Sequence, residues 1–137
     1  MRGRVVLLLF LIFWLFPLEA EAQEEDTVFQ SFDAFTRQWM EKLARAEEFH
    51  RSQRMAVRKT DGGFEAEYTG YDLPSRRITL KKTTSSLTPF IGILTYYEKV
   101  LRSFGRTQKE AMQGPFEVLG TNEVMEVFRY TQGKWEY

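Results

Sequence analysis

The residues that could carry out chemistry in this chain are few, and the clearest are two carboxylates. Glu65 and Glu67 are spaced to lie on one face of a strand, where they could act as a general acid and base or bind a hard cation. Arg58 would face them across a hairpin predicted below and neutralise their charge. A solvated sheet face explains this pair better than catalysis does. We therefore predict no catalytic residues and no metal site.

Other reactive groups are sparse as well. His50 is the single histidine and falls near the end of a predicted helix, where a surface residue that complements the helix dipole is expected. Zinc sites built on imidazole need two or three histidines, and the chain has no cysteine for thiol catalysis, disulfides or thiolate ligands. Phosphate-binding, nucleophile-elbow, dinucleotide-binding and calcium-loop motifs are missing from the sequence. We therefore predict no cofactor.

Two groups of side chains could bind a partner. Four tyrosines on predicted strands could line an apolar pocket and supply hydroxyls to it, or could be core residues with hydroxyls at the rim: Tyr68, Tyr71, Tyr96 and Tyr97. A basic cluster could meet an anion or an acidic partner: Arg51, Arg54 and Arg58. Glutamates nearby in the sequence favour the alternative that this cluster is an ordinary solvated surface.

The N-terminus predicts the compartment. Arg2 and Arg4 precede an apolar run, residues 5–18, which is followed by the small-x-small tripeptide Ala20-Glu21-Ala22. These are the three parts of a secretory signal peptide, so we expect cleavage after Ala22 and a secreted or periplasmic protein. An uncleaved membrane anchor is the alternative, but a spanning helix needs about 20 apolar residues and this run is shorter.

Residues 23–137 would then form a single domain without a stable membrane anchor. The formal net charge of the chain is zero. A neutral chain has no long-range field that would recruit nucleic acid or an anionic membrane. Small secreted domains of animals are commonly rich in disulfides, so a cysteine-free exported chain favours a bacterial setting. The expected partner is a protein or a small apolar ligand.

A long helix is predicted over residues 27–51. Its apolar residues recur at steps of three and four: Phe29, Phe32, Phe35, Trp39, Leu43, Ala46 and Phe49. Thr27-x-x-Gln30 fits a capping box at its start, and residues 23–26 are expected to be a disordered acidic lead. Such large aromatic side chains need a broad apolar surface to cover them, which predicts a sheet.

Alternating residues after the helix predict strands. Asp61-Gly62 would turn a hairpin that places Arg58 opposite Glu65. Residues 72–75, with the sequence DLPS, would make the next turn before a strand over residues 76–84. Residues 88–105 allow a helix that begins at Thr88-Pro89, but their β-branched and aromatic residues favour a central strand over about 90–101.

The C-terminal part predicts a short helix and a hairpin. Thr107-x-x-Glu110 is a capping box for a helix over 108–113. Gln132-Gly133 would then turn a hairpin that sets Tyr130 opposite Trp135. The resulting aromatic ladder could pack beneath the long helix.

The expected fold class is α+β, with one long N-terminal helix packed on a curved antiparallel sheet. This architecture resembles the cystatin-like and NTF2-like cone-shaped folds, although no motif of either family is present. The predicted function is a small exported, non-catalytic domain that binds a protein or an apolar ligand on the concave sheet face. One alternative is an NTF2-like enzyme that uses a buried carboxylate and tyrosines for proton transfer. The other is a structural subunit that forms a homodimer through its strand edges.

Overall fold

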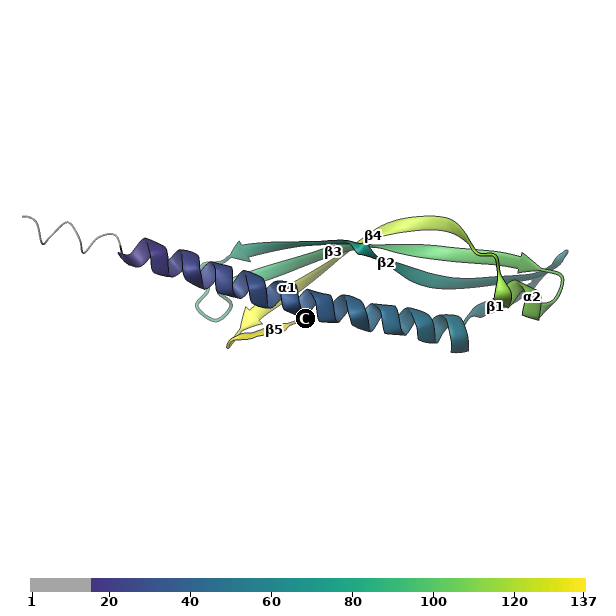
Figure 1. Cartoon of the computed structure of the whole chain (residues 1–137), viewed down its shortest axis with the longest axis horizontal. Helices are drawn as coiled ribbons and strands as arrows, with labels where there is room; N and C mark the ends of the chain where they lie inside the picture. Colours follow the sequence, from purple (N-terminus) through teal and green to yellow (C-terminus); the bar gives the residue numbers. More distant parts are fainter. Residues whose placement is uncertain (1–15) are drawn as a thin grey trace, which may run out of the picture.

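A computed structural model describes residues 16–137, which form one long helix, a five-stranded antiparallel sheet and a short second helix (Figure 1). The strands lie in the order of the sequence, β1-β2-β3-β4-β5. The predicted α+β class is therefore confirmed. The elements in chain order are α1 (Phe16–Gln53), β1 (Ala56–Thr60), β2 (Gly63–Lys82), β3 (Phe90–Gly105), α2 (Gln108–Gln113), β4 (Glu117–Thr131) and β5 (Lys134–Glu136).

Helix α1 begins well before the predicted residue 27. Residues 19–26 are mostly Glu, Ala and Gln, which favour a helix, so the expected disordered lead over 23–26 is helical instead. Thr27 lies inside the helix and its hydroxyl donates to the carbonyl of Gln23 at 2.9 Å. The predicted capping box at Thr27 is therefore wrong.

The predicted leader falls mostly outside the described residues. Its basic start and most of its apolar run lie within residues 1–15, and α1 continues through Ala20-Glu21-Ala22. Cleavage after Ala22 thus stays a prediction. Within residues 16–137, no helix is both long enough and apolar enough to cross a membrane.

Strand β2 replaces two predicted strands and the turn between them. Residues 72–75 form an irregularity within one long strand, where the pairing with β3 shifts between Asp72 and Arg77. The Ser75 hydroxyl donates to the carbonyl of Asp72 and accepts the amide of Tyr97 at 2.9 Å, which holds β2 to β3 across the irregularity. Proline lacks an N–H and suits such a bulge, so Pro74 marks a bulge here and not a turn.

The other predicted elements are confirmed. Residues 90–105 are a strand paired on both sides, so the helical alternative for this segment is wrong. Both hairpins have the expected registers, with Arg58 opposite Glu65 and Tyr130 opposite Trp135. The cap of α2 also forms, because the Thr107 hydroxyl accepts the amide of Glu110 at 3.2 Å.

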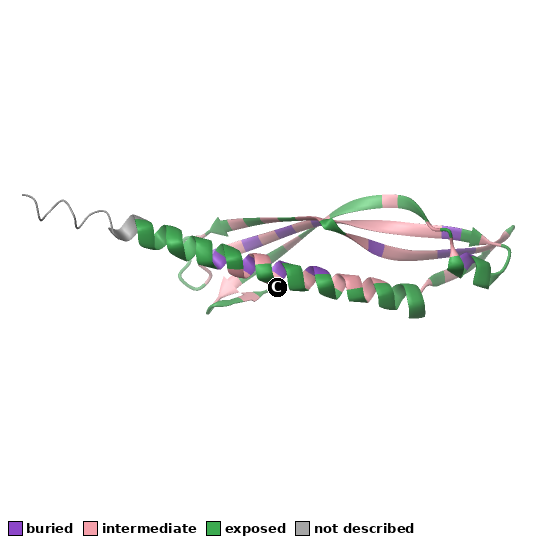
Figure 2. Ribbon diagram, in the orientation of Figure 1, coloured by how far each residue is buried: buried purple, intermediate pink, exposed green. Residues whose placement is uncertain are grey.

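The core lies between the middle of α1 and one face of the sheet (Figure 2). Its fully packed members are Phe32, Met40, Leu94, Tyr96 and Phe128. Burial of each such side chain stabilises the fold by about 1.5–3 kcal/mol. Phe32 lies over Gly92, where a Cβ atom would come within 2.4 Å of the ring. The close approach of helix and sheet at this point therefore requires glycine.

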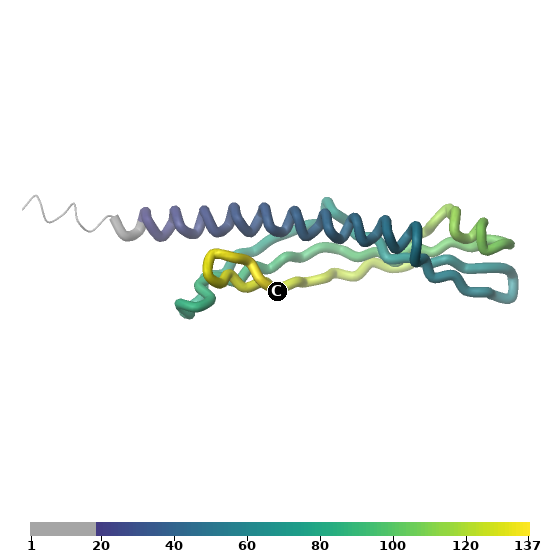
Figure 3. The backbone as a smooth tube through the Cα atoms, turned by 90° about the horizontal axis from the view of Figure 1, so that it is seen from below, coloured from purple at the N-terminus to yellow at the C-terminus, as the bar shows by residue number. Residues whose placement is uncertain are grey.

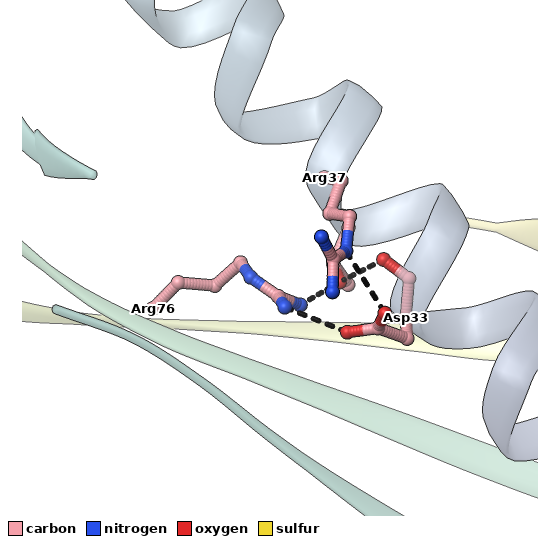
Figure 4. A network of polar contacts seen from close by, with 4 residues as sticks. Asp33, Arg37 and Arg76 are labelled. Carbon is pink, nitrogen blue, oxygen red and sulfur yellow. Dashed lines mark hydrogen bonds and ion pairs between the residues drawn. The ribbon is translucent and has the colours of Figure 1, made fainter. Parts of the chain in front are cut away.

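The sheet curls into a half-barrel around α1, which runs along the strands (Figure 3). On one side, Arg76 of β2 donates to Asp33 at 2.6 Å and to the Thr36 hydroxyl at 2.7 Å (Figure 4). On the other side, the indole of Trp135 in β5 donates to the Ser31 hydroxyl at 3.0 Å. Because both margins of the sheet reach the helix, α1 occupies its concave face.

Candidate functional site

The four predicted tyrosines lie on two different faces of the sheet. Tyr71 and Tyr96 lie on the side of α1, with ring centroids 6.2 Å apart in an edge-to-face arrangement. Tyr97 follows Tyr96 in β3 and therefore points to the opposite face, where its ring lies beneath the guanidinium of Arg77 at 5.6 Å. Tyr68 also belongs to that opposite face and contacts Phe116. The four hydroxyls therefore do not converge on one pocket.

Tyr96 is the most buried of the four and is held by a carboxylate. Its side chain is 2 % exposed and its hydroxyl donates to Glu126 at 3.2 Å. Burial raises the pKa of Tyr96 well above its usual range, and the nearby charge of Glu126 raises it further. The pKa of Tyr71 is raised in the same direction, first by burial and then by Glu98 and Glu47. Both phenols are thus kept neutral, and the Tyr96 hydroxyl acts as a hydrogen-bond donor to Glu126.

Among the residues whose burial is described, Glu65 is the buried carboxylate, and two arginines neutralise it. Its side chain is 6 % exposed and lies 2.5 Å from Arg58 and 3.3 Å from Arg102. Arg102 also contacts Glu67 at 3.0 Å. A cavity of about 220 Å³ opens beside this cluster, lined in part by Ala56 and Arg58. Two carboxylates and two guanidinium groups balance each other here, so the cluster serves as a structural ion-pair network.

The predicted basic cluster is divided among separate partners. Arg51 pairs with Glu48 at 2.9 Å, one turn away on the same helix. The guanidinium of Arg54 lies over the ring of Phe49 at 5.3 Å, and Arg58 belongs to the network around Glu65. The structure therefore gives these three arginines no shared anion site.

The two edges of the sheet differ in a way that the sequence analysis missed. At the β2 edge, β1 pairs with residues 63–67, and α1 lies along the rest. There the carboxylate of Glu47 accepts a hydrogen bond from the backbone N–H of Tyr71 at 2.9 Å, and this N–H has no partner strand on that side. Helix and short strand together cover this edge, as native sheets commonly require.

The opposite margin of the sheet is the outer side of β4. Strand β5 pairs only with residues 129–131 of β4, and no other strand among the described residues pairs with the outer side of residues 117–128. We call this segment the β4 edge. Its first part stays paired with β3, with one irregularity at Leu119, and is largely exposed (Figure 2). The exposed fractions of its apolar side chains reach 63 % at Met125 and 55 % at Leu119. The segment contains no Lys or Pro, and its exposed apolar side chains alternate with polar ones and with Glu117, Glu123 and Glu126. An unpaired edge of this length can serve as a template for pairing with another strand.

The C-terminal hairpin fixes which backbone groups face outward. Its two-residue loop, Gln132-Gly133, has φ angles of 51° and 75°, which are those of a type I′ turn. In such a hairpin Thr131 and Lys134 form a hydrogen-bonded pair, and hydrogen-bonded pairs then alternate along the strand. Hence the odd-numbered residues of β4 direct their N–H and C=O groups to the β5 side. Along the regular part of the β4 edge these are Thr121, Glu123, Met125 and Val127.

Comparison with protein families, with curated proteins and with solved structures finds no match for this chain.

Proposed function

We propose that this chain is a small exported, non-catalytic binding domain that takes up an extended segment of a protein along the β4 edge. One observation carries the proposal: residues 121–127 present unpaired outward backbone groups together with exposed apolar side chains. Strand addition uses these two features, because main-chain hydrogen bonds give affinity and alternate side chains give specificity.

The β4 edge has better support than the concave face that the sequence suggested. Helix α1 fills that face with the core around Phe32 and Phe128, both completely buried. The enzymatic alternative has less support, because the buried carboxylate of Glu65 is held between two arginines. Export rests on the leader pattern of residues 1–22.

The experiment is a selection of short random peptides on the immobilised wild-type chain, followed by binding to two variants at one position. Met125→Pro removes an outward N–H without removing a bond to β3, and a proline at an edge position blocks an incoming strand. Met125→Thr keeps the N–H and a residue suited to strands but removes the apolar side chain. The selected peptides should bind wild type and Met125→Thr, and lose binding to Met125→Pro.

The opposite pattern would overturn the proposal. Peptides that bind Met125→Pro as tightly as wild type use another surface, and a selection that yields no binder leaves the β4 edge without this function. Circular dichroism of Met125→Pro is the control for folding, because the residue is largely exposed and its substitution should leave the spectrum unchanged.

A further inference from the structure

We infer that the extended segment taken up along the β4 edge is cationic and amphipathic, with an apolar, a basic and a second apolar residue opposite Val127, Glu126 and Met125. This inference rests on the proposed function, since it names the substrate class of the same edge. Two observations carry it. They are the alternation of side chains along β4 and the unbalanced charge of the Glu126 carboxylate.

The side chains of the free stretch, residues 121–127, point alternately to the two faces of the sheet. Glu126 lies on the side of α1, because its partner in β3 is Leu94, a member of the core. Met125 and Val127 lie on the opposite, convex face, where they are 63 % and 48 % exposed. An incoming strand therefore meets different chemistry on its two faces.

The convex face favours apolar residues in the incoming strand. Aliphatic side chains opposite Met125 and Val127 would cover apolar surface that is now open to water, and such cross-strand pairs stabilise a sheet. The acidic residue of this row, Glu123, already has a cation, because Arg77 of β2 contacts it at 2.7 Å. This face therefore does not call for a charge in the partner.

Glu126 makes the helix side of the edge negative. Its carboxylate accepts a hydrogen bond from the Tyr96 hydroxyl at 3.2 Å, and a hydrogen bond from the phenol of Tyr137 raises the pKa of that group. Both partners are neutral. Within residues 16–137, no Lys or Arg side chain lies within 4.0 Å of this carboxylate as an ion-pair partner. The charge of Glu126 is thus left for a partner to balance.

The backbone brings an opposing side chain close to Glu126. Outward N–H and C=O groups belong to the odd-numbered residues, so residue 126 and its opposite in an antiparallel strand form a pair without hydrogen bonds. Pairs of this kind have the shorter Cα separation, about 4.5 Å, and the closer side chains. A Lys or Arg at that position can therefore reach the carboxylate.

Strand addition itself creates the need for a cation. Glu126 is partly buried already, and a strand laid beside it would remove more of its contact with water. Burying a charge without a partner is costly, and a like charge directly opposite would destabilise the pairing further. Residues 117–127 contain three glutamates and no basic residue, so the edge as a whole favours a positively charged segment.

The peptide selection described above gives the first test. Peptides selected on the wild-type chain should share an apolar–basic–apolar triplet. Selection on Glu126→Gln should keep the apolar residues and lose the preference for Lys or Arg. Glutamine retains an acceptor oxygen for the Tyr96 hydroxyl, so circular dichroism of this variant should match that of wild type.

A double-mutant cycle with synthetic peptides measures the charge pair itself. The probe is an end-capped, fluorescently labelled peptide with the core Val-Arg-Val-Ile-Thr, and its counterpart has Gln in place of Arg. Anisotropy titration of the full chain, expressed for export, gives the dissociation constants. Glu126→Gln should weaken binding of the Arg peptide about two- to fivefold and leave binding of the Gln peptide unchanged. High salt should reduce the difference.

Asp61→Asn is the matched control. It removes one carboxylate, as Glu126→Gln does, but lies in the turn between β1 and β2, at the end of the sheet away from β5 (Figure 1). Asn-Gly favours the same turn as Asp-Gly, so the fold is kept. Asp61→Asn should bind the Arg peptide as wild type does. An equal loss in both variants would indicate attraction by net charge alone and would overturn the inference.

The outcomes separate this inference from the proposed function. Coupling between the peptide Arg and Glu126, together with loss of the Arg peptide on Met125→Pro, supports both. If selected peptides depend on the backbone of Met125 but show no basic preference, the proposed function stands and the cationic partner is wrong. If binding ignores Met125→Pro, both are wrong. If the chain alone sediments as a dimer that the Arg peptide does not dissociate, a second copy occupies the edge and the inference is also wrong.

Discussion

Gly92 offers a sharp test of how the helix is seated on the sheet. It lies in β3 directly beneath Phe32, and a Cβ atom built at this position would approach the ring at 2.4 Å, where ordinary contacts begin near 3.4 Å. The ring cannot easily move aside, because it is completely buried with Trp135 4.4 Å away, between ring centroids. We therefore expect Gly92→Ala to lower the free energy of unfolding.

Two opposing effects set the size of this loss. Replacing a strand glycine by alanine favours the folded state by about 0.5–1 kcal/mol, since the unfolded chain loses freedom. Forcing an extra methyl group into a packed core costs typically about 1–3 kcal/mol. An overlap of about 1 Å with a confined ring belongs near the upper end of that range. The net loss should be about 1–2 kcal/mol.

Urea unfolding at one fixed protein concentration, followed by tryptophan fluorescence and by circular dichroism, measures this loss. Gly120→Ala is the matched control, since Gly120 also lies in a strand but has no atom within 4 Å of the built Cβ. That variant should be as stable as wild type or slightly more stable.

A double-mutant cycle identifies the cause. Phe32→Leu removes part of the ring that the new methyl group meets, so Gly92→Ala should cost less in this background than in wild type. Residues in contact commonly couple by about 0.5–3 kcal/mol. Purely additive effects, or a Gly92→Ala variant as stable as wild type, would refute the close helix–sheet contact described above.

Three further predictions concern the polar contacts. The pKa of Asp33 is held below its usual 3.8, first by the hydrogen bond to Arg76. The stability that this ion pair contributes is therefore complete above roughly pH 4 and is lost as the pH falls through the lowered pKa. When the free energy of unfolding is measured at decreasing pH, it should fall less for Asp33→Asn than for wild type. Glu47→Ala should leave the amide of Tyr71 without its partner, and hydrogen exchange of that amide should become faster while wild type stays protected. Thr107→Ala should lower the free energy of unfolding by about 1 kcal/mol, and Thr107→Ser, which restores the cap oxygen, should recover most of it.

Local signals explain which elements could be predicted from the sequence. Both hairpins and their registers follow from dipeptides that favour two-residue turns, Asp61-Gly62 and Gln132-Gly133. The capping box of α2 is equally local. The dense β-branched and aromatic residues of 90–105 indicated a strand because a central strand is buried on both faces.

The missed features depend on contacts between distant segments. Pro74 and Ser75 have the composition of a turn, and only the bond from Ser75 to Tyr97 on the next strand keeps the chain extended there. The outer side of the β4 edge is unpaired because of the strand order and because β5 ends where it does, and no local sequence pattern encodes either. The separation of Tyr96 and Tyr97 could have been anticipated, because neighbours in a strand point to opposite faces.

The bond between Trp135 and Ser31 joins residues that are 104 positions apart in the sequence. During synthesis the aromatic stripe of α1 emerges early, while the hairpin that covers it is made only after the other strands. Until then Phe32 and its neighbours remain exposed to water and to other chains. Topologies closed by such distant contacts fold slowly, and their incomplete forms aggregate readily. We therefore expect C-terminal truncation that removes Trp135 to leave the aromatic stripe of α1 exposed and to promote aggregation.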